Sequence, residues 1–322
     1  MANPKVSVMM PAYNAEEFIS DAIQSVLDQD YENLQMVICD DASTDGTARI
    51  ITDYATRYPG KILAICNEKN LGVTRNCNLA LRHCDGTYVA LFAGDDLMLP
   101  GKISAQVEMM TADKNIVLCY HPVEIFDSAS GKTIFVTNQT NREDVYSYSD
   151  ILLKGGIPGG CSIMVRKDAI PDGGYDERLR TVSDWLFFFE ISLKGKITKI
   201  NQVLGRYRKH GGGASQKTLQ LLDESLQALD IASKKYSDVD GLQGLVDRGK
   251  ARYIAGEAFR QLNGNPKFAY DLIKKSMEFD PKNRKYKILK IICWINLRVP
   301  AGHVIVGNFF VKAKYFIKRI GG

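Results

Sequence analysis

Four β-rich segments alternate with three amphipathic helical segments between residues 5 and 92, and this alternation limits the possible folds more than any other feature. The expected strands read KVSVMM, LQMVICD, ILAICN and TYVALFA, at residues 5–10, 34–40, 62–67 and 87–93. Strands that alternate with helices are typical of mostly parallel sheets, because each helix returns the chain to the end of the sheet where the next strand begins. We therefore predict an α/β fold with a Rossmann-like, mostly parallel sheet and helices on both faces.

The first expected helix has the clearest sequence signals. Asn14 and Glu17 have the spacing of a capping box, which predicts that the helix begins there. The apolar side chains that follow at helical spacing are expected to face the sheet, and they are Phe18, Ile19, Ala22, Ile23, Val26 and Leu27.

Polar segments follow all four expected strands. They read PAYN, DDASTDGT, NEKNLGVTRN and AGDD, at residues 11–14, 40–47, 67–76 and 93–96. Because ligands of open α/β sheets bind beyond the carboxyl ends of the strands, we expect these segments to form one binding site. Neither GxxxxGK[ST] nor GxGxxG follows the first strand, which disfavours P-loop nucleotidases and dinucleotide-binding enzymes.

Two adjacent acids, Asp95 and Asp96, come directly after an apolar strand. Neighbouring carboxylates that lose water repel each other, so a nearby cation is expected to offset the cost. Mn²⁺ or Mg²⁺ suits this position because such ions need few protein carboxylates when phosphate oxygens and water complete the coordination shell. Asp40 and Asp41 can accept hydrogen bonds from a base or ribose, and Arg75 can contact phosphate. The sequence therefore indicates a nucleoside diphosphate and a divalent metal.

Residues 5–47, 70–81 and 87–103 together resemble the nucleotide-binding half of family 2 glycosyltransferases. The resemblance rests on KVSVMMPAYNAEEFISDAIQSVLDQDYENLQMVICDDASTDGT, NLGVTRNCNLAL and TYVALFAGDDLMLPGKI. It is nearly continuous over residues 5–110 and weaker to about residue 215. It implies a GT-A fold and a metal-dependent enzyme that inverts the anomeric carbon of a nucleotide-sugar.

The resemblance also implies the donor-binding residues, which are Pro11, Ala12, Tyr13, Asp41, Arg75 and Asp95. The first three are expected to line the uridine pocket, and Asp41 is expected to bond uracil. Arg75 is expected to lie by the diphosphate, and Asp95 by the ribose or donor sugar. The metal is expected on Asp96, and His210 in GRYRKHGGGAS is expected to complete the metal or diphosphate site. Ala93 stands where many family members carry a further acid.

The expected catalytic base lies later in the chain. The segment TVSDWLFFFEISLKGKI, residues 181–197, resembles the segment in which family members place a carboxylate at the start of a helix. Ser183 replaces the usual Glu, so the expected base is Asp184, and such a base typically contributes about 10² to 10⁴ in rate. GGIPGGCSIMVRKDAI resembles the acceptor side of the family, and the residues assigned to the acceptor are Gly160, Cys161, Ser162 and Trp185.

Several of these residues also have a purely structural interpretation. Asp40 and Asp41 could be turn residues, and Asp184 could cap a helix that begins at Trp185. His210 could be an ordinary loop residue, and Arg75 could lie on a solvated helix face.

Two other functions therefore stay open beside the enzyme. Ala93 and Ser183 are compatible with a noncatalytic assembly protein that keeps a degenerate nucleotide-sugar fold. A metal-dependent nucleotidyl or phosphoryl transferase is the second alternative.

The chain is expected to have a glycosyltransferase domain at residues 1–215, divided into halves at 1–110 and 111–215, and a helical region at 216–322. Within the latter, residues 252–286 resemble a tetratricopeptide-like hairpin, which needs a packing partner. Residues 281–322 contain ten Lys or Arg and no Asp or Glu. An apolar stripe within residues 304–320 predicts an interfacial helix on an anionic membrane, although it could instead dock on its own protein.

The expected function is transfer of a single sugar from a UDP-sugar to a hydroxyl of a glycan or lipid-linked acceptor, in surface polysaccharide or glycoconjugate synthesis. No apolar run approaches the roughly 18 residues that span a bilayer, so a cytoplasmic protein, peripheral at the membrane, is expected. The seven cysteines are scattered without a CxxC motif and are expected to be reduced. No nucleic-acid-reading motif is present, and an oligomer through the helical region stays open.

Overall fold

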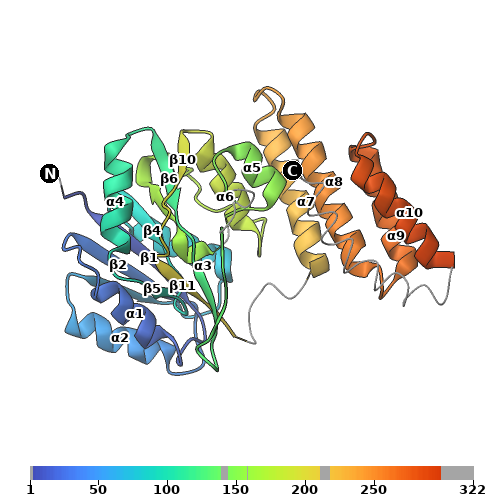
Figure 1. Ribbon diagram of the computed structural model, residues 1–322. Helices are drawn as coiled ribbons and strands as arrows, with labels where there is room; N and C mark the ends of the chain where they lie inside the picture. The colour runs from blue at the N-terminus through green and yellow to red at the C-terminus, as the bar shows by residue number, and fades with distance from the viewer. Residues whose placement is uncertain (1–2, 139–143, 158, 211–217, 299–322) are drawn as a thin grey trace. The chain divides into compact units, whose positions relative to one another are not determined.

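The computed structural model describes residues 3–138, 144–157, 159–210 and 218–298 (Figure 1). The chain divides into two compact units, residues 1–214 and residues 215–322.

The first unit is built on a seven-stranded sheet of strand order β10-β6-β9-β4-β1-β2-β3. Its strands are β1 (Val6–Ala12), β2 (Leu34–Asp40), β3 (Ile62–Cys66), β4 (Tyr88–Leu91), β6 (Ile116–Tyr120), β9 (Met164–Arg166) and β10 (Lys196–Lys199). β9 is antiparallel to both β4 and β6, and the other neighbours pair in parallel. The predicted α/β fold with a mostly parallel sheet is therefore confirmed, including all four strands expected between residues 5 and 93.

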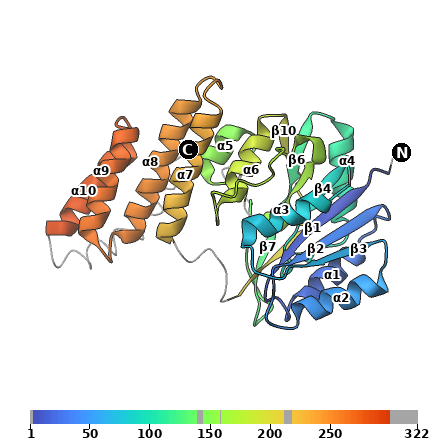
Figure 2. The same cartoon turned by 180° about the vertical axis from the view of Figure 1, so that it is seen from behind.

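Helices cover both faces of this sheet (Figures 1 and 2). They are α1 (Ile19–Leu27), α2 (Thr47–Arg57), α3 (Val73–His83), α4 (Lys102–Ala112), α5 (Tyr148–Lys154) and α6 (Ser183–Ser192). Val6, Val8 and Met10 of β1 belong to the same buried cluster as apolar side chains of α1, α2 and α4. On the opposite face, Asn76 of α3 donates a hydrogen bond of 2.8 Å to the Cys39 carbonyl of β2.

The start of α1 differs from the prediction. The helix begins at Ile19, and no side chain caps it. Asn14 has a φ of +46° and its carboxamide oxygen accepts from the Thr44 backbone N–H, so Asn14 joins two loops and does not start a helix. The capping box of Asn14 and Glu17 was therefore wrong, although the expected apolar stripe is buried at Ile19, Ala22, Ile23 and Val26.

A smaller four-stranded sheet brings late residues beside the loop that follows β4. Its order is β5-β11-β7-β8, and its strands are β5 (Leu97–Met98), β7 (Glu124–Asp127), β8 (Thr133–Val136) and β11 (Gly205–Lys209). β11 pairs with β5 through Gly205–Met98 and Arg206–Leu97. This pairing places residues 206–210 next to the Asp95–Asp96 pair. Two short 3₁₀ turns, η1 (Gly160–Ser162) and η2 (Lys167–Ala169), flank β9.

The second unit consists of packed helices over its described residues. They are α7 (Thr218–Lys235), α8 (Leu242–Gln261), α9 (Pro266–Phe279) and α10 (Arg284–Arg298). The carboxamide oxygen of Asn265 accepts from the Phe268 N–H and caps α9, while Pro266 occupies the first turn, where a missing N–H costs nothing. The expected hairpin corresponds to α8 and α9. It packs against side chains of α7 and α10, including Leu222, Leu289 and Cys293.

The interfacial helix predicted at residues 304–320 lies outside the described residues. Among the described residues, no helix is both long enough and apolar enough to cross a bilayer. All seven cysteines lie in described segments and none forms a disulfide.

Candidate active site

A pocket of about 350 Å³ opens at the carboxyl ends of β1 and β2, beside the loop after β4. It is lined by Pro11, Ala12, Tyr13, Asn14, Ala15, Phe18, Asp41, Asn70, Gly72, Val73, Asn76, Ala93, Gly94, Asp95 and His210. Among the residues assigned to the donor or the metal, Pro11, Ala12, Tyr13, Asp41, Asp95 and His210 are in this set. Arg75 and Asp96 are not.

The two adjacent acids have different surroundings. Asp95 lines the pocket, and its Oδ2 lies 3.1 Å from Nε2 of His210. Asp96 does not line the pocket and is only 2% exposed. Its Oδ1 accepts from the Arg208 N–H at 2.9 Å, and its carboxylate also bonds the Cys161 thiol. Burial, followed by the nearby Asp95 charge, raises the pKa of Asp96.

Gly94 allows this loop to approach β1. A Cβ atom there would lie 2.7 Å from Cδ1 of Ile19 and 3.2 Å from the Ala12 Cβ. The Gly94 N–H donates to the Pro11 carbonyl at 3.2 Å, which ties the loop to the end of β1. A larger residue would push the loop away and would move Asp95 with it.

Arg208 lies beside the acid pair, and its charge favours the ionised form of Asp96; its guanidinium also lies 3.9 Å from the Asp21 carboxylate. Sequence reasoning did not single it out. Its Nε donates to the Asp95 carbonyl at 2.8 Å. The guanidinium carbon lies 4.7 Å from the Phe18 ring centroid and 4.8 Å from that of Phe126, so the cation is held between two aromatic faces. The only available sequence signal was its place in GRYRKH, two residues before His210.

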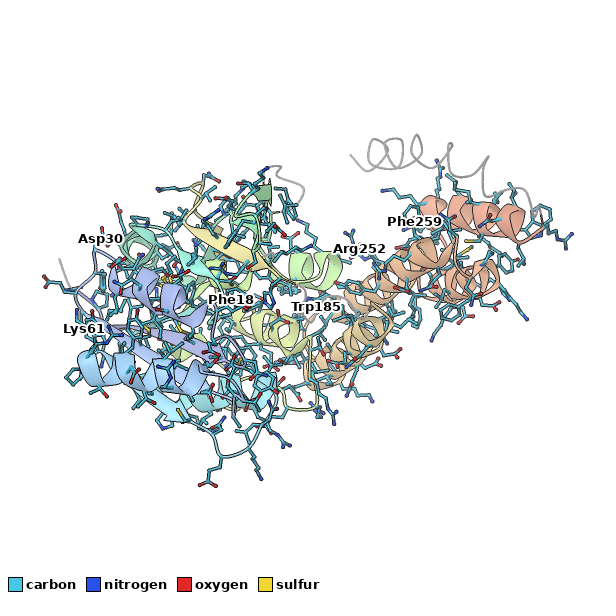
Figure 3. All side chains as sticks on the ribbon, turned by 90° about the horizontal axis from the view of Figure 1, so that it is seen from below. Phe18, Asp30, Lys61, Trp185, Arg252 and Phe259 are labelled. Atoms are coloured by element: carbon cyan, nitrogen blue, oxygen red, sulfur yellow. The ribbon has the colours of Figure 1, made fainter. Side chains whose placement is uncertain are left out.

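Asp95 and His210 form a donor set that suits a divalent cation. Phe18, labelled in Figure 3, supports His210, and the two ring centroids are 5.3 Å apart. One carboxylate and one imidazole are few ligands, but a cation bound to a diphosphate takes much of its coordination shell from phosphate and water. No group of three or more His, Cys, Asp or Glu side chains that could hold a metal occurs in the described part of the chain.

Asp41 shapes one wall of the pocket. Its Oδ1 accepts from the Leu71 N–H at 2.8 Å and from the Asn67 side chain at 3.1 Å, and its Oδ2 accepts from the Gly72 N–H at 2.9 Å. Gly72 has a φ of +83°, a conformation that a side chain would strain. Asp41 therefore fixes the loop that leads into α3 and still faces the pocket. Asp40, in contrast, caps the following turn by accepting from Ser43.

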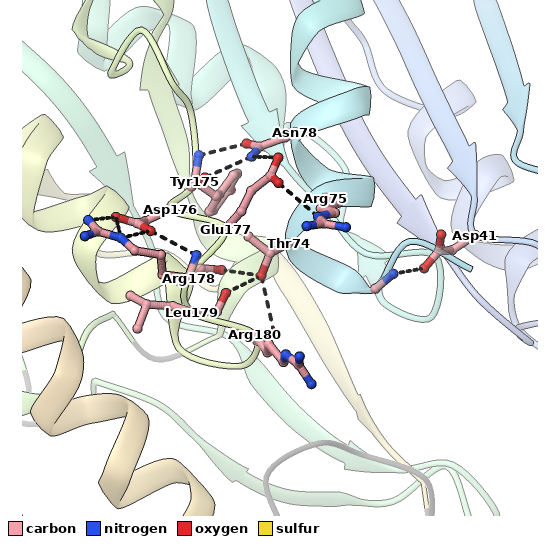
Figure 4. A network of polar contacts seen from close by, with 12 residues as sticks. Asp41, Thr74, Arg75, Asn78, Tyr175, Asp176, Glu177, Arg178, Leu179 and Arg180 are labelled. Atoms are coloured by element: carbon pink, nitrogen blue, oxygen red, sulfur yellow. Dashed lines mark hydrogen bonds and ion pairs between the residues drawn. The ribbon is translucent and has the colours of Figure 1, made fainter. Parts of the chain in front are cut away.

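Arg75 lies outside the pocket. Its Nε is 2.9 Å from Oε2 of Glu177, and both side chains are largely exposed (Figure 4). Arg75 lines a neighbouring depression together with Thr74, Glu177 and Arg180. To contact a diphosphate bound in the pocket, the guanidinium would have to change its direction and leave Glu177.

Two side chains of α3 hold the segment that precedes α6 (Figure 4). The Thr74 hydroxyl is buried and donates to the Leu179 carbonyl at 2.7 Å, and it also lies 3.1 Å from the Ser183 hydroxyl. The Asn78 carboxamide makes two hydrogen bonds of 2.8 Å, with the N–H and the carbonyl of Tyr175. Helix α3 therefore connects the loop fixed by Asp41 with the start of α6.

Asp184 lies in the first turn of α6, as predicted for the base. The helix begins at Ser183, so Asp184 does not cap a helix that begins at Trp185. Its Oδ1 accepts from the Trp185 N–H at 2.9 Å. The carboxylate keeps accessible surface, yet surrounding protein atoms desolvate it and raise its pKa to about 6. Such a group is ionised at pH 7 and more basic than an ordinary aspartate.

Tyr207 on β11 lies close enough to the Asp95–Asp96 pair and to Asp184 for their charges to affect its phenol. Sequence reasoning missed this residue as well. Burial, followed by the charges of Asp96, Asp95 and Asp184, raises its pKa to about 12. Its phenol therefore stays neutral near pH 7.

The residues assigned to the acceptor side have mixed positions. Cys161 and Ser162 are buried, and the Ser162 carbonyl accepts from Gln106. Gly160 has open space where a Cβ would lie. Trp185, labelled in Figure 3, packs against Gly156, where a Cβ would come within 2.8 Å of the indole. The Cys161 thiol bonds the Asp96 carboxylate. Of these four residues, Gly160 and Trp185 retain accessible surface.

A family model described as glycosyl transferase family 2 matches residues 7–170. The putative glycosyltransferase EpsE of Bacillus subtilis is 31% identical over 194 residues, which are 60% of this chain and 70% of EpsE. The Escherichia coli protein named UDP-Glc:alpha-D-GlcNAc-diphosphoundecaprenol beta-1,3-glucosyltransferase WfgD is 34% identical over 160 residues. That match covers 50% of this chain and 59% of WfgD, so the chain spans less than two thirds of the latter's length.

Among solved structures, the S. aureus TarS fragment 1–349 in complex with UDP-GlcNAc has a TM-score of 0.67 to this chain. The match covers 94% of this chain and 92% of that fragment, at 16% sequence identity. At this identity the likeness shows a shared fold, and it agrees with the GT-A fold expected from the sequence.

Proposed function

The chain belongs to glycosyltransferase family 2, and on that premise we propose that it transfers a single sugar from a UDP-sugar to a hydroxyl of a glycan or lipid-linked acceptor. The proposal includes inversion at the anomeric carbon and a role in surface polysaccharide or glycoconjugate synthesis. The observation that carries it is the pocket at the carboxyl edge of the sheet, which has Asp95 and His210 on its rim. The name of WfgD, which describes a UDP-glucose donor and a diphosphoundecaprenol acceptor, supports this class of substrate.

We place the uridine against Pro11, Ala12 and Tyr13. Tyr13 is exposed at the pocket and offers a flat ring to the base or ribose. Asp41 retains acceptor capacity because each carboxylate oxygen has two lone pairs, and three protein donors use three of these four sites. A uracil N–H could occupy the remaining site, while the same carboxylate holds the loop at Leu71 and Gly72.

Asp95 and His210 would hold the divalent cation, which would offset negative charge on the diphosphate. This assignment moves the main metal-binding role from Asp96 to its neighbour, because Asp96 is buried and already accepts from Arg208 and Cys161. Arg208 holds the backbone of Asp95 by donating a hydrogen bond to its carbonyl. The diphosphate role of Arg75 requires the guanidinium to leave Glu177.

Asp184 would act as the general base. As the acceptor oxygen attacks the anomeric carbon, its proton passes to the Asp184 carboxylate and the bond between that carbon and the UDP oxygen breaks. Attack on the face opposite the departing UDP inverts the anomeric centre. The raised pKa of about 6 supports this role, because the carboxylate is both ionised near neutral pH and a better proton acceptor than a fully solvated aspartate.

The experiment that tests the proposal compares Asp184→Asn with a matched variant, Asp168→Asn, whose side chain is exposed on η2. Binding of UDP-sugars is measured by calorimetry in the presence of Mn²⁺, and transfer is followed by UDP release together with the mass gained by the acceptor. We expect Asp184→Asn to bind the donor normally and to lose about 10² to 10⁴ in rate. Asp168→Asn should behave like the wild type.

Three outcomes would contradict the proposal. Release of pyrophosphate or inorganic phosphate instead of UDP would indicate a nucleotidyl or phosphoryl transferase. Absence of any nucleotide-sugar binding would indicate a noncatalytic assembly protein. Full transfer by Asp184→Asn would exclude Asp184 as the base.

A further inference from the structure

Helix α10 has a buried face and an exposed face, and both carry apolar side chains. Leu289, Cys293 and Asn296 point inward, and the Leu289 and Cys293 side chains join the buried cluster of the helical unit. On the opposite side, Ile288 is 51% exposed, Ile291 is 59% exposed and Ile295 is 39% exposed. Residues spaced by three and four positions lie on one side of a helix, so these isoleucines form a continuous apolar strip on the surface.

The strip continues into a groove between α9 and α10, which lie side by side in Figure 1. The groove has a volume of about 420 Å³ and is lined by Tyr270, Met277, Lys287, Lys290, Ile291 and Trp294. Its floor is therefore apolar, with two ammonium groups at its edge. Trp294 is 43% exposed, and the Arg298 guanidinium lies 4.9 Å from the centroid of its ring.

The charge on α10 has one sign. The helix carries five basic residues and no acidic residue, and the basic residues are Arg284, Lys285, Lys287, Lys290 and Arg298. An exposed strip of isoleucines and a tryptophan bordered by lysine and arginine is the pattern of a helix that lies in the interface of an anionic bilayer. Tryptophan in particular prefers the headgroup level of a membrane.

We propose that the exposed face of α10 docks the protein on an anionic phospholipid surface. The apolar strip of Ile288, Ile291 and Ile295 enters the interfacial region together with Trp294. Lys287 and Lys290 contact phosphate groups of the lipids. This proposal is independent of sugar transfer, because it concerns only the helical unit.

Charge argues against two other occupants of this face. A second copy of α10 would bring five basic residues against five, and the two faces would repel. The segment at residues 299–322 contains Lys312, Lys314, Lys318 and Arg319 and no acidic residue, so it has the same sign as α10. An anionic surface complements both.

Sedimentation of the full chain with vesicles tests the proposal. The vesicles contain phosphatidylcholine alone or phosphatidylcholine with 30 mol% phosphatidylglycerol, and each is used at low and high salt. We expect binding only to the anionic vesicles, with affinity that falls as salt rises. The double variant Lys287→Gln with Lys290→Gln should bind about 25-fold more weakly, because each cation near an anionic surface contributes about fivefold.

Matched variants separate the face of α10 from general surface effects. Ile288→Ser with Ile291→Ser should weaken binding at least tenfold, whereas Ile134→Ser, at a position that is also 51% exposed, should have no effect. Lys114→Gln with Lys132→Gln removes the same charge from exposed positions in the other unit and should change binding less than twofold. Circular dichroism confirms that each variant is folded.

Four results would overturn the proposal. The first is equal binding to neutral and anionic vesicles, and the second is no binding to either. The third is that both α10 variants bind vesicles like the wild type, whereas Lys312→Gln with Lys314→Gln does not bind them. This result would assign the contact to the segment after α10. The fourth is a change in oligomeric mass by light scattering, with vesicle binding unchanged in the α10 variants, which would assign the face to a second copy.

Discussion

Replacing Thr74 with valine tests whether α3 positions the start of α6. Valine has nearly the shape of threonine, so the change removes the hydroxyl and leaves the packing almost intact. The hydroxyl of Thr74 donates to the Leu179 carbonyl, as Figure 4 shows, and it also contacts the Ser183 hydroxyl. Asp184 follows Ser183 directly, so loss of the hydrogen bonds of Thr74 should displace the candidate base.

The expected magnitude follows from the number and burial of these bonds. Thr74 is buried, so its loss leaves the Leu179 carbonyl without this donor in a site that water reaches poorly. An unsatisfied buried acceptor costs about 1–3 kcal/mol, and the lost contact with Ser183 adds about 1 kcal/mol. We therefore expect the free energy of unfolding to fall by about 2–4 kcal/mol. Because small displacements of a catalytic group can cost up to about 10² in rate, kcat should fall at least tenfold with little change in donor affinity.

Urea unfolding followed by tryptophan fluorescence measures the change in stability. The chain contains two tryptophans, Trp185 in the first unit and Trp294 in the second. A Trp294→Phe background therefore makes Trp185 a probe of the first unit alone. Thr74→Ser keeps the hydroxyl and should restore kcat. Thr56→Val removes an exposed hydroxyl that bonds only within its own helix and is the matched control.

If Thr74→Val unfolds at the same urea concentration as the wild type and retains its kcat, then Thr74 neither stabilises the fold nor positions Asp184. A loss of stability with unchanged kcat would show that Thr74 stabilises the fold but does not position Asp184.

Three further predictions concern charge. The proposed base, Asp184, must be deprotonated to accept a proton, and its pKa is raised to about 6, so kcat should be level above pH 7 and fall about tenfold per unit well below pH 6. A rate profile that is flat from pH 5 to 7 would contradict this. His210→Ala should raise the Mn²⁺ concentration needed for half-maximal transfer while leaving metal-free UDP binding unchanged, and equal Mn²⁺ dependence would remove His210 from the metal site. Burial lowers the pKa of Lys102 to about 8 from 10.5, so the unfolded state binds more protons between these pH values. The free energy of unfolding of the wild type, measured relative to that of Lys102→Met, should therefore rise by about 3 kcal/mol over that window, and a constant difference between the two proteins would contradict this.

The repeating part of the fold could be predicted because its signals are local. Each of the first four strands is a short β-rich run, and α1 has an apolar stripe that faces the sheet. The antiparallel strand β9 could not be predicted from MVR alone, because its place between β4 and β6 depends on partners more than 40 residues away. The capping box failed because the Asn14 side chain bonds Thr44, which only the folded loop brings near.

The sequence could predict most residues of the candidate site but not the contacts that those residues make. The sequence identified Asp95 and Asp96 as an unusual pair. It could not show which of the two is buried, because that depends on the conformation of the turn that carries them. Arg75 pairs with Glu177, a residue 102 positions later, and no local pattern could indicate that contact. Arg208 was missed for a similar reason, since its importance comes from β11 pairing beside the acids.

The position of β9 has a consequence for how the chain is synthesised. All four residues of β4 are buried, and one edge of that strand is covered by β9, which comes from residues 164–166. A ribosome releases β4 long before β9, so the growing chain presents the open edge of an apolar strand until the missing partner emerges. Such an edge invites pairing with other chains. The first four parallel strands therefore cannot complete the sheet by themselves, and the later segment that contributes β9 also protects the edge of β4 from pairing with other chains.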